Sequence, residues 1–300
     1  MKIVQLERIT KAYGEKIAVR DLSLEMETGR IFGLLGPNGA GKTSTLRMMI
    51  GMTLPDSGTV SLFQAPFTRE SLRRVGYLPE ERGLYKKMKV LDQLVLLGQL
   101  RGISASQAAQ RATHWAERLQ IADALDKKTD ALSKGMQQKI QFIAAILHDP
   151  ELVMMDEPFS GLDPVNTLLL QDVLVEMKNQ GKAILFSTHR MDQVEKLCDS
   201  ICLMHGGAAV LSGSVREIKS RYPRNYLDIQ FEGDATFLSH PMISEAKNYN
   251  GSAEIRLKDG ADPQQILAAA MTGARIYRFE LREPTLEEIF IQTVGGKTNA

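Results

Sequence analysis

A glycine-rich stretch that ends in a lysine and a threonine is the segment of this chain best suited to chemistry. The residues Gly36, Pro37, Asn38, Gly39, Ala40, Gly41, Lys42 and Thr43 match the spacing G-x-x-x-x-G-K-[ST]. Glycine admits positive φ and leaves no Cβ between the backbone and a bound phosphate. Lys42 is expected to reach the β- and γ-phosphates, and the Thr43 hydroxyl to hold Mg²⁺, with Ser44 beside it. The stretch therefore predicts a site for a nucleoside triphosphate such as ATP.

The elements on either side of this stretch decide between a nucleotide site and a glycine-rich turn that binds nothing. The apolar run 31–35 predicts a short buried strand, and the apolar residues of 44–50 recur at helical spacing. A helix that begins at the end of the loop presents unpaired N–H groups and the positive end of its dipole to a phosphate. This order of strand, loop and helix favours the nucleotide site.

Two adjacent carboxylates form the second group with a chemical role. The apolar run 152–155 ends in Asp156 and Glu157, and Pro158 follows. Such a run predicts a parallel strand buried on both faces, and open α/β sheets bind their ligands at the carboxyl edge of these strands. We expect Asp156 to hold Mg²⁺ and Glu157 to orient and deprotonate an attacking water. The alternative is a strand that simply ends in a polar turn.

A histidine and a tyrosine are weaker candidates. His189 follows the run 183–187, which predicts another buried strand, so it is expected at the same sheet edge as Glu157. It is either a partner in catalysis or a structural hydrogen-bonding group. Tyr13 lies on a predicted loop between strands at 2–6 and 17–24. Its ring either stacks on an adenine or packs locally.

Composition limits the classes of function. The 300 residues carry a formal net charge of +1 with acids and bases interspersed, which argues against a broad nucleic-acid-binding face. The chain shows no signal peptide, no apolar run of 18 residues and no expected lipid anchor, so it is not predicted to span a bilayer itself. Cys198 and Cys202 are the only cysteines, and they predict reduced, packed thiols in a cytosolic protein.

The chain divides into two predicted domains. Residues 1–222 form an α/β domain, in which 90–147 is strongly helical and reads as an inserted subdomain. A charged, proline-marked boundary at 221–224 leads to a small α+β domain at 225–300. This second domain carries no catalytic constellation. Its last helix is predicted to begin with a capping box, Thr285 to Glu288.

Taken together, the motifs resemble those of the ATP-binding subunit of an ABC transporter over residues 1 to about 220. The resemblance implies a P-loop NTPase core of ABC type with an antiparallel β subdomain and an inserted helical subdomain. The matching positions come in the family's order. Tyr13 corresponds to the adenine-stacking aromatic, Gly36 to Thr43 to the phosphate loop, and Leu132 to Met136 to the signature LSGGQ. Further along, Asp156 and Glu157 correspond to the acids, Ser160 to Asp163 to the loop that contacts the opposite subunit, and His189 to the switch histidine. The resemblance thus implies that Glu157, His189 and Lys42 are catalytic.

The chain departs from the family pattern at three positions. The signature has Lys134 in place of glycine and Met136 in place of glutamine. The usual loop glutamine corresponds to Glu80. A carboxylate at that position can still ligate Mg²⁺ or a water molecule, but it adds negative charge beside the triphosphate.

The resemblance also implies partners. Two ATPase subunits, identical or similar, would pair head to tail, with Ser133 and Gly135 of one copy at the γ-phosphate bound by the other copy and Asp163 in the contact. The loop 80–89 would lie by the groove that receives a helix of an integral-membrane permease at the cytoplasmic face. The segments 78–85, 132–139 and 282–290 resemble ATPase subunits of bacterial ABC-2 type exporters, especially the sodium-exporting group. The alternatives are an exporter of antibiotics or other compounds, and a soluble ABC ATPase that acts outside transport.

Overall fold

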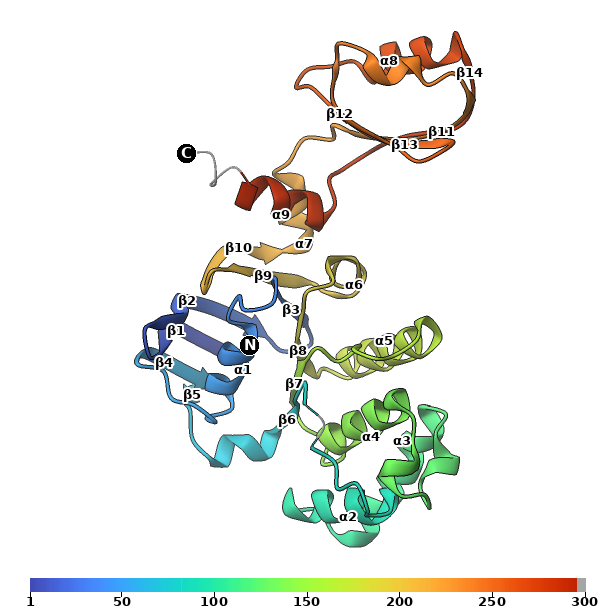
Figure 1. Ribbon diagram of the computed structural model, residues 1–300. Helices are drawn as coiled ribbons and strands as arrows, with labels where there is room; N and C mark the ends of the chain where they lie inside the picture. Colours follow the sequence, from blue (N-terminus) through green and yellow to red (C-terminus); the bar gives the residue numbers. More distant parts are fainter. Residues whose placement is uncertain (82, 296–300) are drawn as a thin grey trace. The chain divides into compact units, whose positions relative to one another are not determined.

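The computed structural model describes residues 1–81 and 83–295, and the chain forms two compact units (Figure 1). The first unit ends at Val215 and the second begins at Arg216. The predicted boundary at 222–225 therefore falls inside the second unit, shortly after helix α7 (Val215–Ser220). Residues 82 and 296–300, which fall in the predicted loop and in the predicted second domain, lie outside the described residues.

A six-stranded sheet forms the centre of the first unit. Its strands are ordered β10-β9-β3-β8-β7-β6, and all neighbours are parallel except β10 and β9. The strands are β3 (Ile31–Leu35), β6 (Val75–Leu78), β7 (Leu152–Asp156), β8 (Ala183–Thr188), β9 (Ser200–His205) and β10 (Ala208–Ser214). Every residue of β3, β7 and β8 is buried, as expected for parallel strands covered on both faces.

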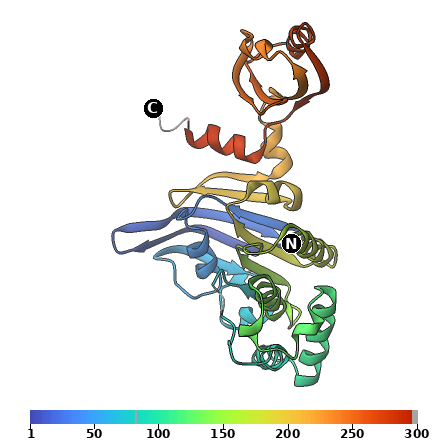
Figure 2. The same cartoon turned by 45° about the vertical axis from the view of Figure 1, so that its right-hand side comes forward.

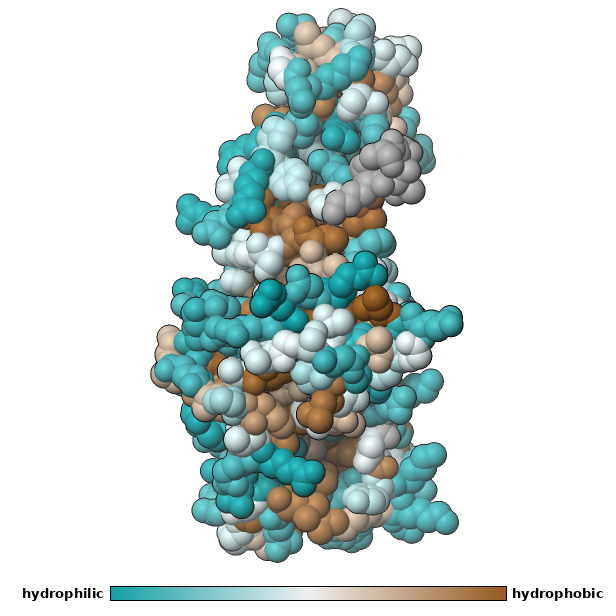
Figure 3. Space-filling model, turned by 90° about the vertical axis from the view of Figure 1, so that its left-hand side faces the viewer, coloured by the Kyte–Doolittle hydropathy of each residue, from teal (hydrophilic) through white to brown (hydrophobic). Residues whose placement is uncertain are grey.

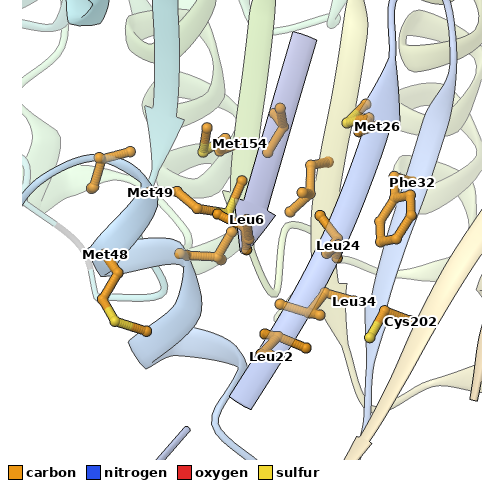
Figure 4. Packing of buried hydrophobic residues seen from close by; sticks show 14 of the residues in the cluster. Leu6, Leu22, Leu24, Met26, Phe32, Leu34, Met48, Met49, Met154 and Cys202 are labelled. Carbon is orange, nitrogen blue, oxygen red and sulfur yellow. The ribbon is translucent and has the colours of Figure 1, made fainter. Parts of the chain in front are cut away.

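An antiparallel sheet packs on one side of this central sheet. Its order is β2-β1-β4-β5, with strands β1 (Lys2–Tyr13), β2 (Lys16–Glu27), β4 (Ser57–Leu62) and β5 (Ala65–Pro66). Residues at alternate positions of β2 are buried, so that one face meets the core. In Figure 4 the side chains Leu22, Leu24 and Met26 of β2 meet Phe32 and Leu34 of β3. Helix α1 (Lys42–Met49) adds Met48 and Met49 to the same core.

The remaining helices of the first unit lie in two places. Helices α5 (Pro164–Asn179) and α6 (Met191–Leu197) lie on the side of the central sheet opposite the antiparallel sheet (Figures 1 and 2). Helices α2 (Val90–Leu100), α3 (Ala105–Arg118) and α4 (Lys134–Ile146) form the inserted helical subdomain. The α/β fold with antiparallel and helical subdomains, as predicted, is confirmed.

The second unit is an antiparallel sheet with helices. The sheet order is β12-β13-β11-β14, with strands β11 (Tyr226–Gly233), β12 (Ile243–Asn248), β13 (Ser252–Leu257) and β14 (Ala274–Arg282). Helix α8 (Pro263–Met271) shares a core with β11 and β13, and helix α9 (Leu286–Gly295) completes the described part. The capping box of α9 is confirmed, since Thr285 N donates to Glu288 Oε2 at 2.6 Å and Glu288 N donates to Thr285 Oγ1 at 3.2 Å.

Two local predictions need correction. Tyr13 is not on a loop: strands β1 and β2 run further than predicted, and Tyr13 is the last residue of β1, opposite Lys16. Strand β12 and helix α6 were not predicted; all residues of β12 after Ile243 are exposed, so no apolar alternation marks it.

The surface has a mixed character. Figure 3 shows hydrophilic residues spread over the face that it presents, with smaller hydrophobic areas among them. This distribution fits a chain in which charges of both signs are interspersed. Among the described helices, none is both long enough and apolar enough to cross a membrane.

Candidate active site

The carboxyl ends of three neighbouring strands bring the predicted site residues together. In the parallel register, Leu35 of β3 lies opposite Thr188 of β8, and Ser187 of β8 lies opposite Asp156 of β7. The residues that follow these strands, Gly36, Glu157 and His189, therefore start from one sheet edge. This is the edge at which open α/β sheets bind ligands.

The phosphate loop has a backbone that only glycine accepts at two positions. Gly36 has φ +147° and Gly41 has φ +105°. A Cβ at Gly36 would lie 2.3 Å from the Met204 carbonyl oxygen, and a Cβ at Gly41 would lie 2.4 Å from that of Ala18. Gly41 is also the N-cap of α1, so the loop leads directly into a helix N-terminus whose N–H groups favour an anion.

The Lys42 ammonium lies inside the loop. Its Nζ donates to the carbonyl oxygens of Gly36 at 2.7 Å and Pro37 at 3.2 Å, and it is 3.9 Å from Glu157 Oε1. Burial lowers the pKa of Lys42, and the carboxylates of Glu157, Asp156 and Glu80 act in the opposite direction. The same side chain thus faces both the phosphate loop and the acids at the end of β7.

Asp156 has one oxygen engaged and one oxygen left over. The Ser187 hydroxyl donates to Asp156 Oδ1, whereas Oδ2 is buried and has no hydrogen-bond partner within the described chain. A buried carboxylate oxygen without a partner is costly unless a ligand satisfies it. Together with the Thr43 hydroxyl on the same pocket, this oxygen fits Mg²⁺, which takes one or two protein oxygens and completes its shell with phosphate oxygens and water.

Glu157 adopts a backbone conformation that is rare for a residue with a side chain. Its φ is +49°, and its N–H donates to Ser187 O at 3.1 Å and Ser187 Oγ at 3.2 Å, which hold the turn. Such positions are strained and cluster at active sites. His189 Nδ1 lies 2.9 Å from Glu157 Oε1, and the side chains are 54% and 11% exposed, respectively. A mostly buried carboxylate is therefore oriented by a more exposed imidazole.

One pocket of about 350 Å³ collects these groups. Most of the predicted site residues line it, and two lining residues, Lys16 and Ala18 at the start of β2, were not predicted. The predicted residues that line it are Tyr13, Asn38, Gly39, Ala40, Gly41, Lys42, Thr43, Ser44, Glu80, Asp156 and Glu157. The pocket combines an aromatic ring, an anion-binding loop, a candidate metal ligand and a candidate general base. It can bind a nucleoside triphosphate and direct water at its terminal phosphate.

Six predicted site residues do not line this pocket. Gly36 and Pro37 contact the pocket residue Lys42, and His189 contacts Glu157. The other three are Ser133, Gly135 and Asp163. Ser133 caps α4 and accepts a hydrogen bond from Met136 N at 3.2 Å; Asp163 caps α5 and accepts one from Asn166 N at 2.9 Å. A Cβ built on Gly135 would lie 3.6 Å from Gly161 O, so the signature segment and the loop 160–163 adjoin each other. These residues form a separate surface of the same unit.

Two supporting residues were missed by sequence reasoning. Ser187 bridges Asp156 and the Glu157 backbone, and its only signal was a polar residue in a buried run. Gln141 of α4 donates from Nε2 to Pro79 O at 3.1 Å and to Glu81 O at 3.0 Å. No pattern in the sequence connects Gln141 to a loop some sixty residues earlier.

A second cavity, of about 380 Å³, lies in the second unit between β13 and α9. Its walls include Tyr226, Ile255, Arg256 and Glu288. Gln292 Nε2 donates to the Tyr226 hydroxyl at 2.7 Å, and Arg282 pairs with Glu288 at 2.7 Å. Tyr226 and Glu288 are thus paired with neighbouring side chains, and the described residues of this cavity form no acid–base or nucleophile arrangement.

Comparisons with known proteins agree with this geometry. The ABC transporter family model matches residues 19–160, and the model of the ATP-binding protein DrrA1-3-like, C-terminal domain matches residues 213–294. The uncharacterized ABC transporter ATP-binding protein YhaQ of Bacillus subtilis is 44% identical over 98% of this chain and 99% of its own length. The chain belongs to the ATP-binding subunits of ABC transporters. As a member of this family it binds and hydrolyses ATP.

Other ABC relatives extend the match. The Nod factor export ATP-binding protein I of Cupriavidus metallidurans is 33% identical over 98% of this chain and 97% of its own length. A solved ATP-binding subunit of an ABC transporter aligns with a TM-score of 0.68 at 28% identity, covering 73% of this chain and 92% of that one. A nucleotide-free ATP-binding cassette aligns with a TM-score of 0.65 at 25% identity, covering 73% and 94%. The relatives that match along the whole chain include export proteins.

Proposed function

We propose that this chain is the ATP-hydrolysing subunit of a bacterial ABC-2 type exporter that works with an integral-membrane permease at the cytoplasmic face. The observation that carries the proposal is the pocket in which Lys42, Asp156 and Glu157 meet the phosphate loop, while Ser133 and Gly135 lie elsewhere. In an ATPase of this family, signature residues that lie away from the pocket of their own copy can reach a γ-phosphate only in the pocket of a second copy. A second copy is therefore needed to complete the site.

Each pocket residue has a role in this proposal. Tyr13 stacks on the adenine, and the loop 36–44 holds the phosphates with the N–H groups of residues 38–44 and the Lys42 ammonium. Thr43, Asp156 and Glu80 would hold Mg²⁺, which would neutralise charge on the phosphates. Glu157 accepts a proton from the attacking water, and His189, 2.9 Å away, keeps the carboxylate oriented.

The second copy supplies the other half of the site. Ser133 and Gly135 stand at the N-terminus of α4, whose N–H groups suit the γ-phosphate bound by the partner. Asp163 stands at the N-terminus of α5 beside the same surface. In a two-fold pair, each copy gives its signature segment to the pocket of the other. Cleavage of the γ-phosphate removes the shared ligand and lets the pair open.

The permease contact is proposed at the loop 80–89. Tyr85 in this loop is 55% exposed, and the nearby helix α2 exposes Leu100 at 72%. Apolar side chains at the junction of the core and the helical subdomain suit the apolar face of a short helix from the membrane partner. A pull-down from membranes should return a polytopic permease. Recovery of ribosomes or DNA instead would favour an ABC ATPase acting outside transport.

For the cargo, sodium is the candidate that the sequence resemblance implies. The relatives named for Nod factor export show that chains of this length and similarity serve other cargoes. The test is ATP-dependent ²²Na⁺ accumulation in inverted vesicles that contain the chain and its permease, with Glu157→Gln as the inactive control. Accumulation that depends on Glu157 supports sodium; ATPase activity without sodium movement assigns the subunit to another exported compound.

A further inference from the structure

Gln141 fixes the backbone on both sides of Glu80. It lies on α4, is 5% exposed, and its Nε2 donates to the carbonyls of Pro79 and Glu81 at 3.1 and 3.0 Å. Its Oε1 is buried and has no partner within the described chain. The unpaired amide oxygen costs stability, so the hydrogen bonds donated by the amide nitrogen are the interactions that favour this position of the side chain. The donors grip the two peptide groups that flank Glu80.

Glu80 is the third carboxylate of the phosphate pocket. It lines the pocket with Asp156 and Glu157, and all three carboxylates act on the Lys42 ammonium. Among the described residues that line the pocket, the charged side chains are Lys16 and Lys42 against Glu80, Asp156 and Glu157, two positive and three negative charges. The carboxylates oppose the anion that the phosphate loop attracts, and a bound cation offsets their charge.

We propose that Glu80, positioned by Gln141, makes nucleotide binding depend on a divalent cation: its carboxylate disfavours the metal-free triphosphate and favours the metal complex. The inference rests on the proposed function in taking this pocket as the triphosphate site. A glutamine at position 80, which is the family's usual residue, offers an oxygen without the charge. Glu80 thus selects the form in which the nucleotide enters.

The size of the effect follows from Coulomb's law with screening. Glu80 is exposed, so its field acts through a high effective dielectric and is weakened by salt. A unit charge a few ångströms from a phosphate under these conditions changes affinity by roughly tenfold. The carboxylate attracts a bound Mg²⁺, and this attraction changes the affinity for the magnesium complex by a similar factor in the favourable direction. The sensitive quantity is therefore the ratio of the affinity for the magnesium–nucleotide complex to the affinity for the metal-free nucleotide.

The experiment is calorimetric titration of the full chain with AMP-PNP, a non-hydrolysable ATP analogue, in EDTA and in MgCl₂. We expect Glu80→Gln to bind metal-free AMP-PNP about tenfold more tightly than the wild type and magnesium–AMP-PNP no more tightly. The matched control is Glu81→Gln. It removes the same charge from the neighbouring residue, whose side chain does not line the pocket. It should leave the ratio unchanged. Equal ratios in Glu80→Gln and the wild type overturn the proposal.

The positioning role is tested with Gln141→Met, which keeps an unbranched side chain of similar length and removes the amide group. We expect it to shift the ratio about threefold toward that of Glu80→Gln, and to have no further effect when Glu80 is already Gln. A thermal melt confirms the fold. An unchanged ratio in the folded Gln141→Met variant overturns the positioning role. No AMP-PNP binding in either buffer would refute the proposed function itself, whereas binding with an unchanged ratio refutes only this inference.

Discussion

Replacing Glu157 by Gln removes one negative charge from the active site and little else. The Glu157 N–H bonds to Ser187, at 3.1 and 3.2 Å, involve the backbone and survive, and a glutamine oxygen can still face His189 Nδ1. The side chain is 11% exposed, so the substitution exchanges one mostly buried polar side chain for another of nearly the same size. The variant therefore isolates proton acceptance from folding.

The loss of a positioned general base lowers turnover by roughly 10²–10⁴-fold. This corresponds to about 3–5 kcal/mol in the activation barrier. Because the carboxylate also faces the Lys42 ammonium at 3.9 Å, ATP affinity has to be measured in the same preparation. We expect affinity to be retained, since Lys42 keeps its bonds to the carbonyls of Gly36 and Pro37.

The assay is single-turnover release of phosphate from ATP at pH 7, with calorimetric binding alongside. The matched control is Glu117→Gln, which removes one charge from an exposed position of α3 in the helical subdomain and should behave as the wild type. If Glu157→Gln turns over ATP at the wild-type rate while the control is normal, Glu157 is not the base and the assignment of the site fails.

Three further changes probe the site and the core. Gly36→Ala places a Cβ 2.3 Å from Met204 O at a residue whose φ is +147°. We therefore expect the free energy of unfolding, measured by chemical denaturation, to fall by about 2–4 kcal/mol, and ATP binding to be undetectable. A stable variant that binds ATP would contradict the strained conformation of this loop. Tyr13→Ala should weaken ATP binding by about 5- to 100-fold through lost stacking, with Tyr13→Phe as the control that keeps the ring, and equal affinities in all three proteins would place the adenine elsewhere. Burial lowers the pKa of His148 to about 4, below the value of an unfolded histidine, so stability is full above about pH 6.5 and is lost as the pH falls toward 4. Discounted for partial exposure, the free energy of unfolding should fall by about 1–2 kcal/mol over this pH range because of His148. His148→Gln, measured by urea denaturation across the same range, should lack this loss. If the variant loses as much stability as the wild type, other groups cause the acid sensitivity.

Much of the catalytic core is local in sequence and was predictable for that reason. The strand, glycine loop and helix around Gly36 follow one another directly, and the acids of β7 follow their own strand. The capping box of α9, Thr285 to Glu288, was likewise predicted from adjacent residues and is confirmed. Parallel pairing then brings these strand ends to one edge without further sequence information.

What was missed depends on contacts between distant segments. Lys16 joins the pocket because β1 and β2 extend to a tight hairpin, which brings Lys16 opposite Tyr13. In the sequence Gln141 is an ordinary polar residue of a predicted helix. Its role follows only from the contact between α4 and the loop at Glu80. The exposed strand β12 carries no apolar alternation, because its neighbour β13 supplies the buried side chains. Periodicity describes burial within one element and is silent on which elements meet.

The central claim is that the pocket is half of a site and that a second copy supplies Ser133 and Gly135. The most direct measurement is the mass in solution of Glu157→Gln, which holds ATP without cleaving it, by sedimentation velocity with and without magnesium–ATP. The account predicts that ATP converts this variant from monomer to dimer, and that adding Ser133→Arg keeps it monomeric although ATP still binds. A Glu157→Gln protein that stays monomeric when saturated with ATP, or a Ser133→Arg variant that dimerises equally well, would contradict it.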